Sequence, residues 1–332
     1  ADEKVTNESL KNNIEYIYIE DSEDEESRCI IKGDMKGYPT GYLGEVPSNI
    51  IELQGTADDL GRALAGWWGP EDSQFLIVIG KNNKKCKVVN GCLLSSDGKT
   101  LYYYVGDGIA FDWKVVIPDS VQTISPWAFA QARVKEVVLG KNVENIGEYA
   151  FSDIGWWSDN FKLTVNKKLK RIGKKAFSKT ELGKVVFKSN VFMEPSAFHN
   201  DEEIYYLKKD VRKWSTVLDK AYLKKDKMHI SFCKIPQAKG YQIRVKRGKK
   251  TYNYVTTKND FSVVAPKTLK KNYKTKFTYN WFYENKNKIE GTPAYVTVRP
   301  YKLSKNKKKI YGKWSSKMIL TMTEKNAGWV LW

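Results

Sequence analysis

The chain has 332 residues, enough for two or three domains, and its longest clean apolar run, Phe75 to Ile79, is far too short to span a bilayer. Its 57 Lys and Arg residues exceed its 38 Asp and Glu residues, so the net charge is +19. The charge is uneven, with 25 basic and 31 acidic residues in 1–207 (a net −6) against 32 and 7 in 208–332 (a net +25). This asymmetry indicates separate modules, with an anionic partner or surface for the C-terminal one.

Residues 1–83 are interpreted as an N-terminal region that covers the end of the module that follows. The chain begins Ala-Asp-Glu with no hydrophobic leader, which we expect of a mature protein after signal cleavage. The acidic run 21–26 lacks the alternating oxygen ligands and central glycine of a calcium loop. We therefore expect a solvated loop there and no metal site.

Within this region, residues 48–80 predict a strand, a helix and a strand. Thr56 and Asp59 are spaced like a capping box that opens a helix through about Trp67. Gly69-Pro70 ends that helix, and 75–79 indicates a buried strand. An alternative is a degenerate copy of the repeat described below, with Ala63-Leu64 in the place of its Ala-Phe pair.

Residues 84–104 predict a three-stranded meander, because Asn90-Gly91 and Asp97-Gly98 are strong hairpin turns. A two-residue turn at Asn90-Gly91 places Cys92 opposite Val89 and Cys86 near Ser95. Cys86 and Cys92 are then not opposite each other, so we favour thiols over a bridge. With Cys29 and Cys233, the four cysteines are too few for a disulfide scaffold.

A short phrase ending in Ala-Phe recurs four times between Val115 and Leu207. Its phenylalanines are Phe129, Phe151, Phe177 and Phe198, so the spacings are 22, 26 and 21 residues. Apolar residues also recur 12, 8 and 5 positions before the phenylalanine in three units, and the fourth unit fits with a one-residue deletion. A period in the low twenties predicts a solenoid in which each unit covers its neighbour's apolar face.

Each unit contains one strand, a turn and a return segment. The strands are the β-branched phrases at 115–117, 137–139, 163–165 and 185–187. The Ile-Gly-x-x-Ala-Phe segment is predicted to return as a short helical or irregular turn, with Phe filling the space between layers. Stacking then aligns the strands into a parallel sheet.

The phrases VVIPDSVQTISPWAF, VVLGKNVENIGEYAF and LTVNKKLKRIGKKAF resemble the BspA-like class of leucine-rich repeats. The text KVVNGCLLSSDGKTLYYY is similar to a hairpin that often precedes such repeats. The resemblance covers roughly 84–207. It implies a secreted or surface protein of bacteria, often in adhesion or host contact, and it brings no catalytic residue.

The second repeat has an inserted loop at 155–160 that contains Trp156 and Trp157. Adjacent tryptophans in a loop on a rigid scaffold are a candidate contact for a carbohydrate or protein. The alternative is that one or both fold back onto the solenoid, as large aromatic residues usually do.

Residues 208–226 are Lys-rich and are predicted to connect the modules, with Val211, Trp214, Val217 and Leu218 as one helical face that seals the last repeat.

Strand patterns then follow at 228–232, 240–248, 295–301 and 311–322. Together they resemble a fibronectin type III sandwich, with Ala-x-Gly-Tyr opening one strand and Tyr-Gly-x-Trp-Ser-Ser near the end. Phe232 replaces the usual core Trp, and 251–294 is about twenty residues longer than such a domain needs, with 278–283 as a candidate extra strand.

The sequence contains no recognisable catalytic motif. Neither histidine, His199 or His229, has a cysteine or a second histidine at metal-ligand spacing. No nucleophile elbow, phosphate loop, dinucleotide fingerprint or HExxH is present. We expect no enzyme and no cofactor. A hydrolase remains an alternative, which a pocket gathering carboxylates or His199 would support and a smooth repeat face would oppose.

Basic residues of the C-terminal module form two clusters. One holds Arg244, Lys246, Arg247, Lys249 and Lys250, and the other holds Lys305 and Lys307 to Lys309. Lysine predominates, which favours a solvated surface or salt-sensitive attachment to anionic wall polymers or acidic glycans over nucleic-acid binding.

The predicted organisation is mainly β. It comprises a cap (1–83), a leucine-rich-repeat solenoid with a leading hairpin (84–207), a linker (208–226), a basic fibronectin III-like sandwich (227–323) and a tail (324–332). The expected function is non-enzymatic binding at the bacterial surface, as a monomer, with adhesion to a host protein or glycan through the repeats. The alternative is a spacer that the basic domain holds to an anionic cell-wall polymer. These functions follow from the resemblance and from the missing motifs.

Overall fold

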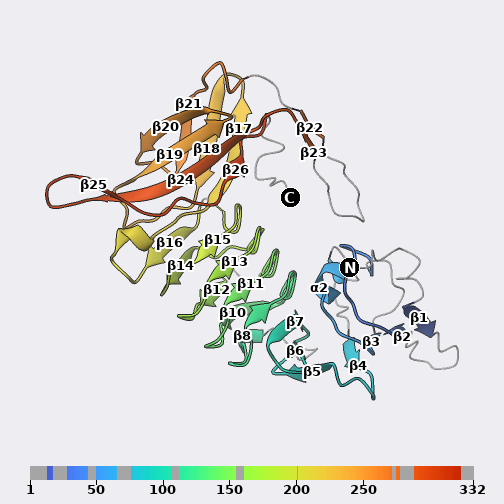
Figure 1. Cartoon of the computed structure of the whole chain (residues 1–332). Coiled ribbons are helices and arrows are strands. Elements are labelled where there is room, and N and C mark those ends of the chain that lie inside the picture. Colours follow the sequence, from blue (N-terminus) through green and yellow to red (C-terminus); the bar gives the residue numbers. More distant parts are fainter. Residues whose placement is uncertain are drawn as a thin grey trace.

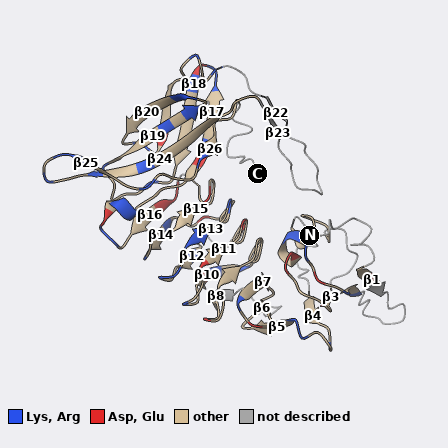
Figure 2. Cartoon of the chain, in the orientation of Figure 1, with Lys and Arg blue, Asp and Glu red and all other residues tan. Residues whose placement is uncertain are grey.

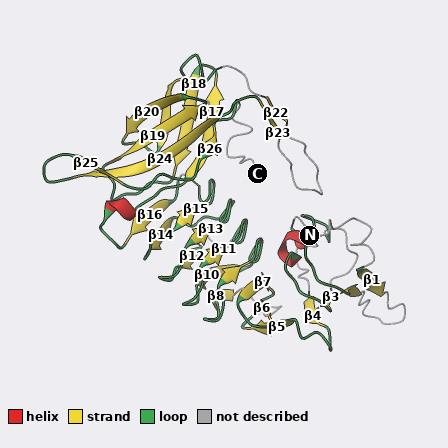
Figure 3. Cartoon of the chain, in the orientation of Figure 1, coloured by secondary structure: helices red, strands yellow, loops and turns green. Residues whose placement is uncertain are grey.

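The structure is a computed structural model that describes residues 13–17, 28–43, 50–65, 76–106, 112–154, 161–199, 201–270, 274–276 and 288–322. A parallel β-solenoid leads into two antiparallel sheets, and the described residues contain almost no helix (Figures 1 and 3). The mainly-β prediction and the solenoid are confirmed.

Each repeat contributes one strand to each of two parallel walls. The first wall consists of two parallel sheets, whose first four strands overlap the predicted strand phrases. One sheet holds β8 (Asp112–Val116), β10 (Val134–Val138) and β12 (Lys162–Thr164), and the other holds β14 (Lys184–Phe187) and β16 (Glu203–Tyr206). The second wall has two-residue strands, β9 (Thr123–Ile124), β11 (Asn145–Ile146), β13 (Arg171–Ile172) and β15 (Phe192–Met193). The apolar residues of the repeat lie between the walls in one continuous core.

The Ala-Phe segments are turns, and the helical form of them that the sequence allowed is wrong. In every unit the residue two positions before the phenylalanine has a positive φ: Trp127, Tyr149, Lys175 and Ser196. So does the residue two positions after three of the phenylalanines: Gln131, Asp153 and Lys179. Left-handed residues at both positions prevent a helix from propagating through the corner.

The phenylalanines of successive repeats stack on one another at this corner. Ring centroids are 5.0 Å apart for Phe129–Phe151, 5.3 Å for Phe151–Phe177 and 4.8 Å for Phe177–Phe198. The backbone N–H groups of Phe129, Phe151 and Phe177 donate to the alanine carbonyl of the next repeat, as in Phe129 to Ala150 at 2.7 Å. The phenylalanine position of the repeat therefore makes two kinds of contact between units, a stack of side-chain rings and a ladder of backbone hydrogen bonds.

The predicted meander is confirmed as β5 (Cys86–Val89), β6 (Cys92–Ser95) and β7 (Thr100–Tyr104). Cys86 lies opposite Ser95 and Cys92 opposite Val89, as the turn predicted. Alternate residues of β6 and β7 face two different cores: Leu94 and Leu101 the solenoid core, Leu93 and Tyr102 an N-terminal core. Tyr104 extends the ring stack, 4.9 Å from Phe129.

The N-terminal region repeats the solenoid pattern. Strands β2 (Arg28–Ile31), β3 (Ile50–Leu53) and β4 (Leu76–Ile79) are parallel and in register, with β1 (Ile14–Ile17) antiparallel to β2. Leu43 N–H donates to Ala63 O at 2.8 Å, as phenylalanine does to alanine in the later repeats. This bond supports the reading of the region as a degenerate repeat with Ala63-Leu64 in the Ala-Phe slot.

The helix in this region is shorter than the capping-box spacing predicted. Helix α2 spans only Leu60–Leu64, and its N-cap residue Asp59 makes no side-chain cap bond. The Asp59 carboxylate instead accepts the Gly37 N–H at 2.6 Å. Residues 66–75, which include the rest of the predicted helix, lie outside the described part of the chain.

The C-terminal module, termed here the two-sheet domain, has two antiparallel sheets over one core. The first sheet consists of β17 (Leu218–Lys224), β18 (Lys227–Phe232) and β21 (Asp260–Val264). The second consists of β20 (Lys250–Thr256), β19 (Gly240–Arg247), β24 (Ala294–Leu303), β25 (Lys309–Tyr311) and β26 (Met318–Ile319). Phe232 lies fully buried between them, and β22 (Lys274–Lys276) pairs with β23 (Lys288–Glu290) outside both sheets. The candidate strand 278–283 is not among the described residues.

The segment 208–226 differs from the predicted linker. It holds a 3₁₀ turn, η1 (Val211–Lys213), and then β17, a full strand of the first sheet. Trp214 and Val217 belong to the solenoid core, whereas Leu218 belongs to the two-sheet core. Ser196 N–H donates to Leu218 O at 2.7 Å, so β17 starts where the next corner of the solenoid would lie. The modules therefore join without a flexible connector.

We expect Phe151→Ala to lower the free energy of unfolding by about 3–5 kcal/mol, because it removes a fully buried ring from the middle of the stack. Urea unfolding followed by circular dichroism measures this change. Phe192→Ala is the matched control, since Phe192 is 51% exposed on the same solenoid, and we expect a change below about 1 kcal/mol. Equal losses in both variants would contradict the role assigned to the stack.

Candidate functional site

The positions that flank the phenylalanine at the Ala-Phe corner differ from repeat to repeat. Core slots hold the same residue types in each unit, but the positions flanking the phenylalanine do not. Those positions carry aromatic, amide, acidic, hydroxyl and basic side chains. Because consecutive rungs are about 5 Å apart, side chains in one slot lie next to each other along the axis.

A hollow of about 300 Å³, termed here the corner hollow, opens among these side chains. Its repeat residues come from three slots, two before, one after and two after the phenylalanine. They are Trp127 and Tyr149, then Ala130, Ser152 and Ser178, then Gln131, Asp153 and Lys179. Thr40 and Ala65 of the N-terminal region complete the lining.

Two stacked aromatic rings form the apolar part of the corner hollow. The rings of Trp127 and Tyr149 are nearly parallel, with centroids 4.2 Å apart, and Lys175 Nζ lies 5.6 Å from the Tyr149 ring. Burial, and after it the charge of Glu148, raises the pKa of Tyr149 to about 12, so its hydroxyl stays neutral. The stack is rigid and presents a neutral hydroxyl beside amide, hydroxyl and carboxylate groups.

The N-terminal region is held against this corner by specific contacts. Arg62 of α2 pairs with Glu148 at 3.2 Å. A Cβ on Gly61 would lie 2.6 Å from the Trp127 carbonyl oxygen, so only glycine permits this approach of the helix. The corner hollow is therefore a joint product of the degenerate repeat and the regular ones.

A second hollow of about 450 Å³, termed the His199 hollow, continues along the same corner and shares Lys179. Its lining includes His199, Asp201 and Glu202. This composition is the feature that would support a hydrolase.

The His199 imidazole is committed to structural bonds. The Lys179 N–H donates to Nε2 at 3.1 Å, which occupies the lone pair that a general base needs. Nδ1 faces the buried Asp219 carboxylate at 3.7 Å, and this contact raises the pKa of His199. The nearby Cys233 thiol is fully buried, donates to the His199 carbonyl, and has a raised pKa because of that burial. The described groups thus provide no activated nucleophile.

Glu202 is the most perturbed acid of this hollow. Its side chain is almost fully buried, and one carboxyl oxygen accepts the His199 N–H at 3.0 Å. Burial raises the pKa of Glu202 to about 8. The carboxyl is therefore a neutral acid near pH 7, buried beside the backbone of His199 at the last corner of the solenoid.

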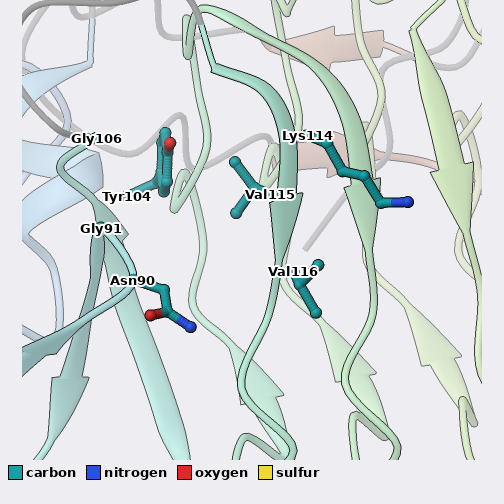
Figure 4. Close-up of a pocket in the computed structure, with 7 residues that line it drawn as sticks. All are labelled: Asn90, Gly91, Tyr104, Gly106, Lys114, Val115 and Val116. Carbon is teal, nitrogen blue, oxygen red and sulfur yellow. The ribbon is translucent and has the colours of Figure 1, made fainter.

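A third hollow, of about 270 Å³, lies between the β5–β6 turn and β8 (Figure 4). Asn90, Gly91, Tyr104 and Gly106 line one side, and Lys114, Val115 and Val116 line the other. Lys114 is its single charged residue and pairs with Glu136 at 3.6 Å. This set of groups offers an apolar contact but no acid–base pair.

Of the residues predicted for binding, Trp156 and Trp157 fall in 155–160, outside the described residues. The five basic residues predicted for binding, which lie between Arg244 and Lys250, occupy different places in the structure. Arg247 donates to the carbonyls of Thr292 and Thr268, at 2.9 and 2.8 Å, and closes one end of the domain. Arg244 and Lys246 lie on the outer face of the second sheet, and Lys249 and Lys250 lie at the β19–β20 turn.

Sequence reasoning missed Trp127, Tyr149, Gln131 and Asp153 as site residues. The available signal was their slot, since they flank an otherwise constant Ala-Phe pair. These residues have left-handed backbone conformations although none of them is glycine, so nothing in the sequence indicated the turn that exposes them.

Among the described residues, no three His, Cys, Asp or Glu side chains are grouped so that they could hold a metal ion. Neither helix in the described part of the chain has the length or apolar character that a membrane crossing requires.

Residues 112–210 match the family described as BspA type leucine-rich repeat region, in six copies. No protein of curated function matches the chain. Two solved structures are similar, both with a TM-score of 0.38 over 49% of this chain. One is the pneumococcal vaccine antigen PcpA, at 18% identity over 44% of that chain. The other is a leucine-rich repeat protein from Eubacterium ventriosum ATCC 27560, at 16% identity over 50% of that chain. This chain thus spans half or less of their length.

The raised pKa of Glu202 makes stability depend on pH. Between about pH 4.5 and 8 the unfolded chain has lost the Glu202 proton that the folded chain keeps, so stability falls as pH rises through this window. Glu202→Gln has no proton to lose. We expect the variant to gain about 3–4 kcal/mol over the native protein between pH 5 and pH 8, measured by urea unfolding. Glu181→Gln, an exposed acid of the same hollow, is the control. An equal pH profile for both variants would contradict the assignment.

Proposed function

We propose that the protein is a non-enzymatic binding protein of the bacterial surface or secreted fraction, and that its repeats hold a host protein or glycan at the corner hollow. The observation that carries the proposal is the lining of that hollow. Its repeat residues all come from slots that vary between units, while the core slots do not. Variable side chains on a constant scaffold are the usual basis of recognition in repeat proteins.

The chemistry of the corner hollow suits a polar ligand with some apolar surface. The Trp127–Tyr149 pair offers ring edges and a neutral hydroxyl, and Gln131, Asp153 and Lys179 add an amide, an acid and a base. Sugars and peptide side chains present matching groups. The BspA-type repeat region at 112–210 supports a surface or secreted location.

Binding is favoured over catalysis because the reactive groups around the His199 hollow are bonded or buried. Its imidazole lone pair accepts a backbone N–H, and its thiol is buried. The carboxyl that has a raised pKa is itself almost fully buried. Among the described residues of the His199 hollow, these side chains are all engaged or buried, which favours binding over hydrolysis there.

A second proposed function is attachment to an anionic cell-wall polymer through the two-sheet domain. We propose that this domain is fibronectin type III-like, and the pairing of strands as β17-β18-β21 and β20-β19-β24-β25 supports it. Its basic surface favours an anionic partner (Figure 2). The repeats would then also act as a spacer.

The first proposal is tested on the full chain, because the solenoid and the two-sheet domain share buried residues at their junction. A glycan and matrix-protein array identifies ligands, and titration gives affinities. We expect Trp127→Asn with Tyr149→Asn to weaken binding at least tenfold, since aromatic anchors contribute most of an interface. Asparagine is chosen because it tolerates the positive φ of both positions.

Phe192→Ala is the control, because that aromatic residue is exposed on the same solenoid but outside the hollow. Asp153→Asn serves as a milder variant that keeps the corner intact. Unchanged affinity in the double variant, with the fold retained by circular dichroism, would rule out the corner hollow as the binding site.

A further inference from the structure

The outer face of the second sheet of the two-sheet domain is basic and contains no acid. Strands β19, β20, β24 and β25 hold no Asp or Glu. Lys and Arg recur along the strands of this domain (Figure 2). Strand alternation places Gln242, Arg244 and Lys246 of β19 on the outer face, beside Tyr295, Thr297 and Arg299 of β24.

Two arginines and two aromatic rings alternate on this face, and we term the group the guanidinium stack. Arg244 Cζ lies 4.0 Å from the Trp314 ring centroid. Arg299 Cζ lies 4.3 Å from the same ring and 4.0 Å from the Tyr311 ring. Arg299 Nε donates to Gln242 Oε1 at 2.9 Å, which fixes its rotation.

The guanidinium stack is not neutralised within the described residues, where no carboxylate pairs with Arg244 or Arg299. Burial, and then the neighbouring charge of Arg244, lowers the pKa of Arg299. Cation–π contacts offset part of this cost and hold two like charges side by side. A surface that keeps two cations adjacent without a counter-ion is preorganised for an external anion.

Geometry selects which anion fits. A guanidinium stacked on a ring keeps its N–H donors at its edge, where they match the oxygens of carboxylate, sulfate or phosphate. Lys246 lies opposite Tyr295 in the strand register, and Lys317 Nζ lies 5.0 Å from the Tyr295 ring. The two arginines are therefore continued along the face by two exposed lysines.

The same geometry disfavours nucleic acid. Single-stranded nucleic acids are held by bases that stack on open aromatic faces. Trp314 already carries two guanidinium groups and Tyr311 one, so these rings are occupied by the protein's own cations. The face thus offers anion contacts without base stacking.

We propose that Arg244 and Arg299, with Lys246 and Lys317, form a defined site for the anionic groups of an acidic polysaccharide. The proposal rests on the second proposed function and deepens it, because it replaces diffuse charge with a specific pair of arginines. Arg247, Lys249 and Lys250 lie outside the site.

The test uses the full chain and four probes: phosphomannan, alginate, dextran sulfate and single-stranded poly-dT. Dissociation constants are measured from 50 to 300 mM NaCl for Arg244→Gln, Arg299→Gln, Arg299→Lys and the control Lys305→Gln with Lys308→Gln. The control removes more charge from an exposed loop of the same domain. Thermal unfolding verifies each fold, and Arg299→Lys keeps a cation over Trp314 if the glutamine variants are unstable.

We expect each arginine variant, including Arg299→Lys, to weaken binding of the best polysaccharide at least tenfold. The double lysine control should change it less than threefold. The phosphate, carboxylate and sulfate probes identify which anion the site prefers.

Equal losses in arginine and lysine variants would overturn the defined site but leave the anchoring function standing. Binding to no polyanion at 50 mM NaCl would overturn both. Tighter, arginine-dependent binding of poly-dT would overturn the polysaccharide assignment in favour of nucleic acid.

Discussion

The ring stack and backbone ladder at the Ala-Phe corner support the rest of the structure. Each phenylalanine ring covers the next, and the N–H groups of the first three phenylalanines reach the alanine of the following repeat. The strands of the second wall have only two residues each, so its own ladder forms few bonds between successive rungs. The corner therefore sets the spacing of the rungs, and the walls follow that spacing.

The same corner generates the candidate site. The alanine is fully buried, and the residue two positions before each phenylalanine adopts a left-handed conformation at the corner. The core and the candidate site thus share one short segment, with the phenylalanine inward and its neighbours outward. The side chains that line the corner hollow can therefore change without a change in the ring stack.

The features that could be predicted from the sequence are those that depend on its repeat period and on local turn residues. The four units, their strands, the meander and the positions of Cys86 and Cys92 are all local patterns, and the structure bears them out. The sequence did not predict the corner conformations, because Trp127 and Tyr149 adopt positive φ without being glycine. The sequence also did not predict the guanidinium stack. Arg244 lies 55 residues or more before Arg299 and Trp314 in the chain, and the three side chains meet only in the folded sheet. The linker at 208–226 was misjudged because a lysine-rich composition hid strand β17.

The junction of the solenoid with the two-sheet domain has a mechanical consequence. Trp214 and Val217 lie in the solenoid core, and Leu218 begins the next sheet, so no slack segment separates the modules. If both proposed sites are occupied at once, tension between the guanidinium stack and the corner hollow passes through every intervening rung in series. The weakest rung would then determine how much force the molecule withstands.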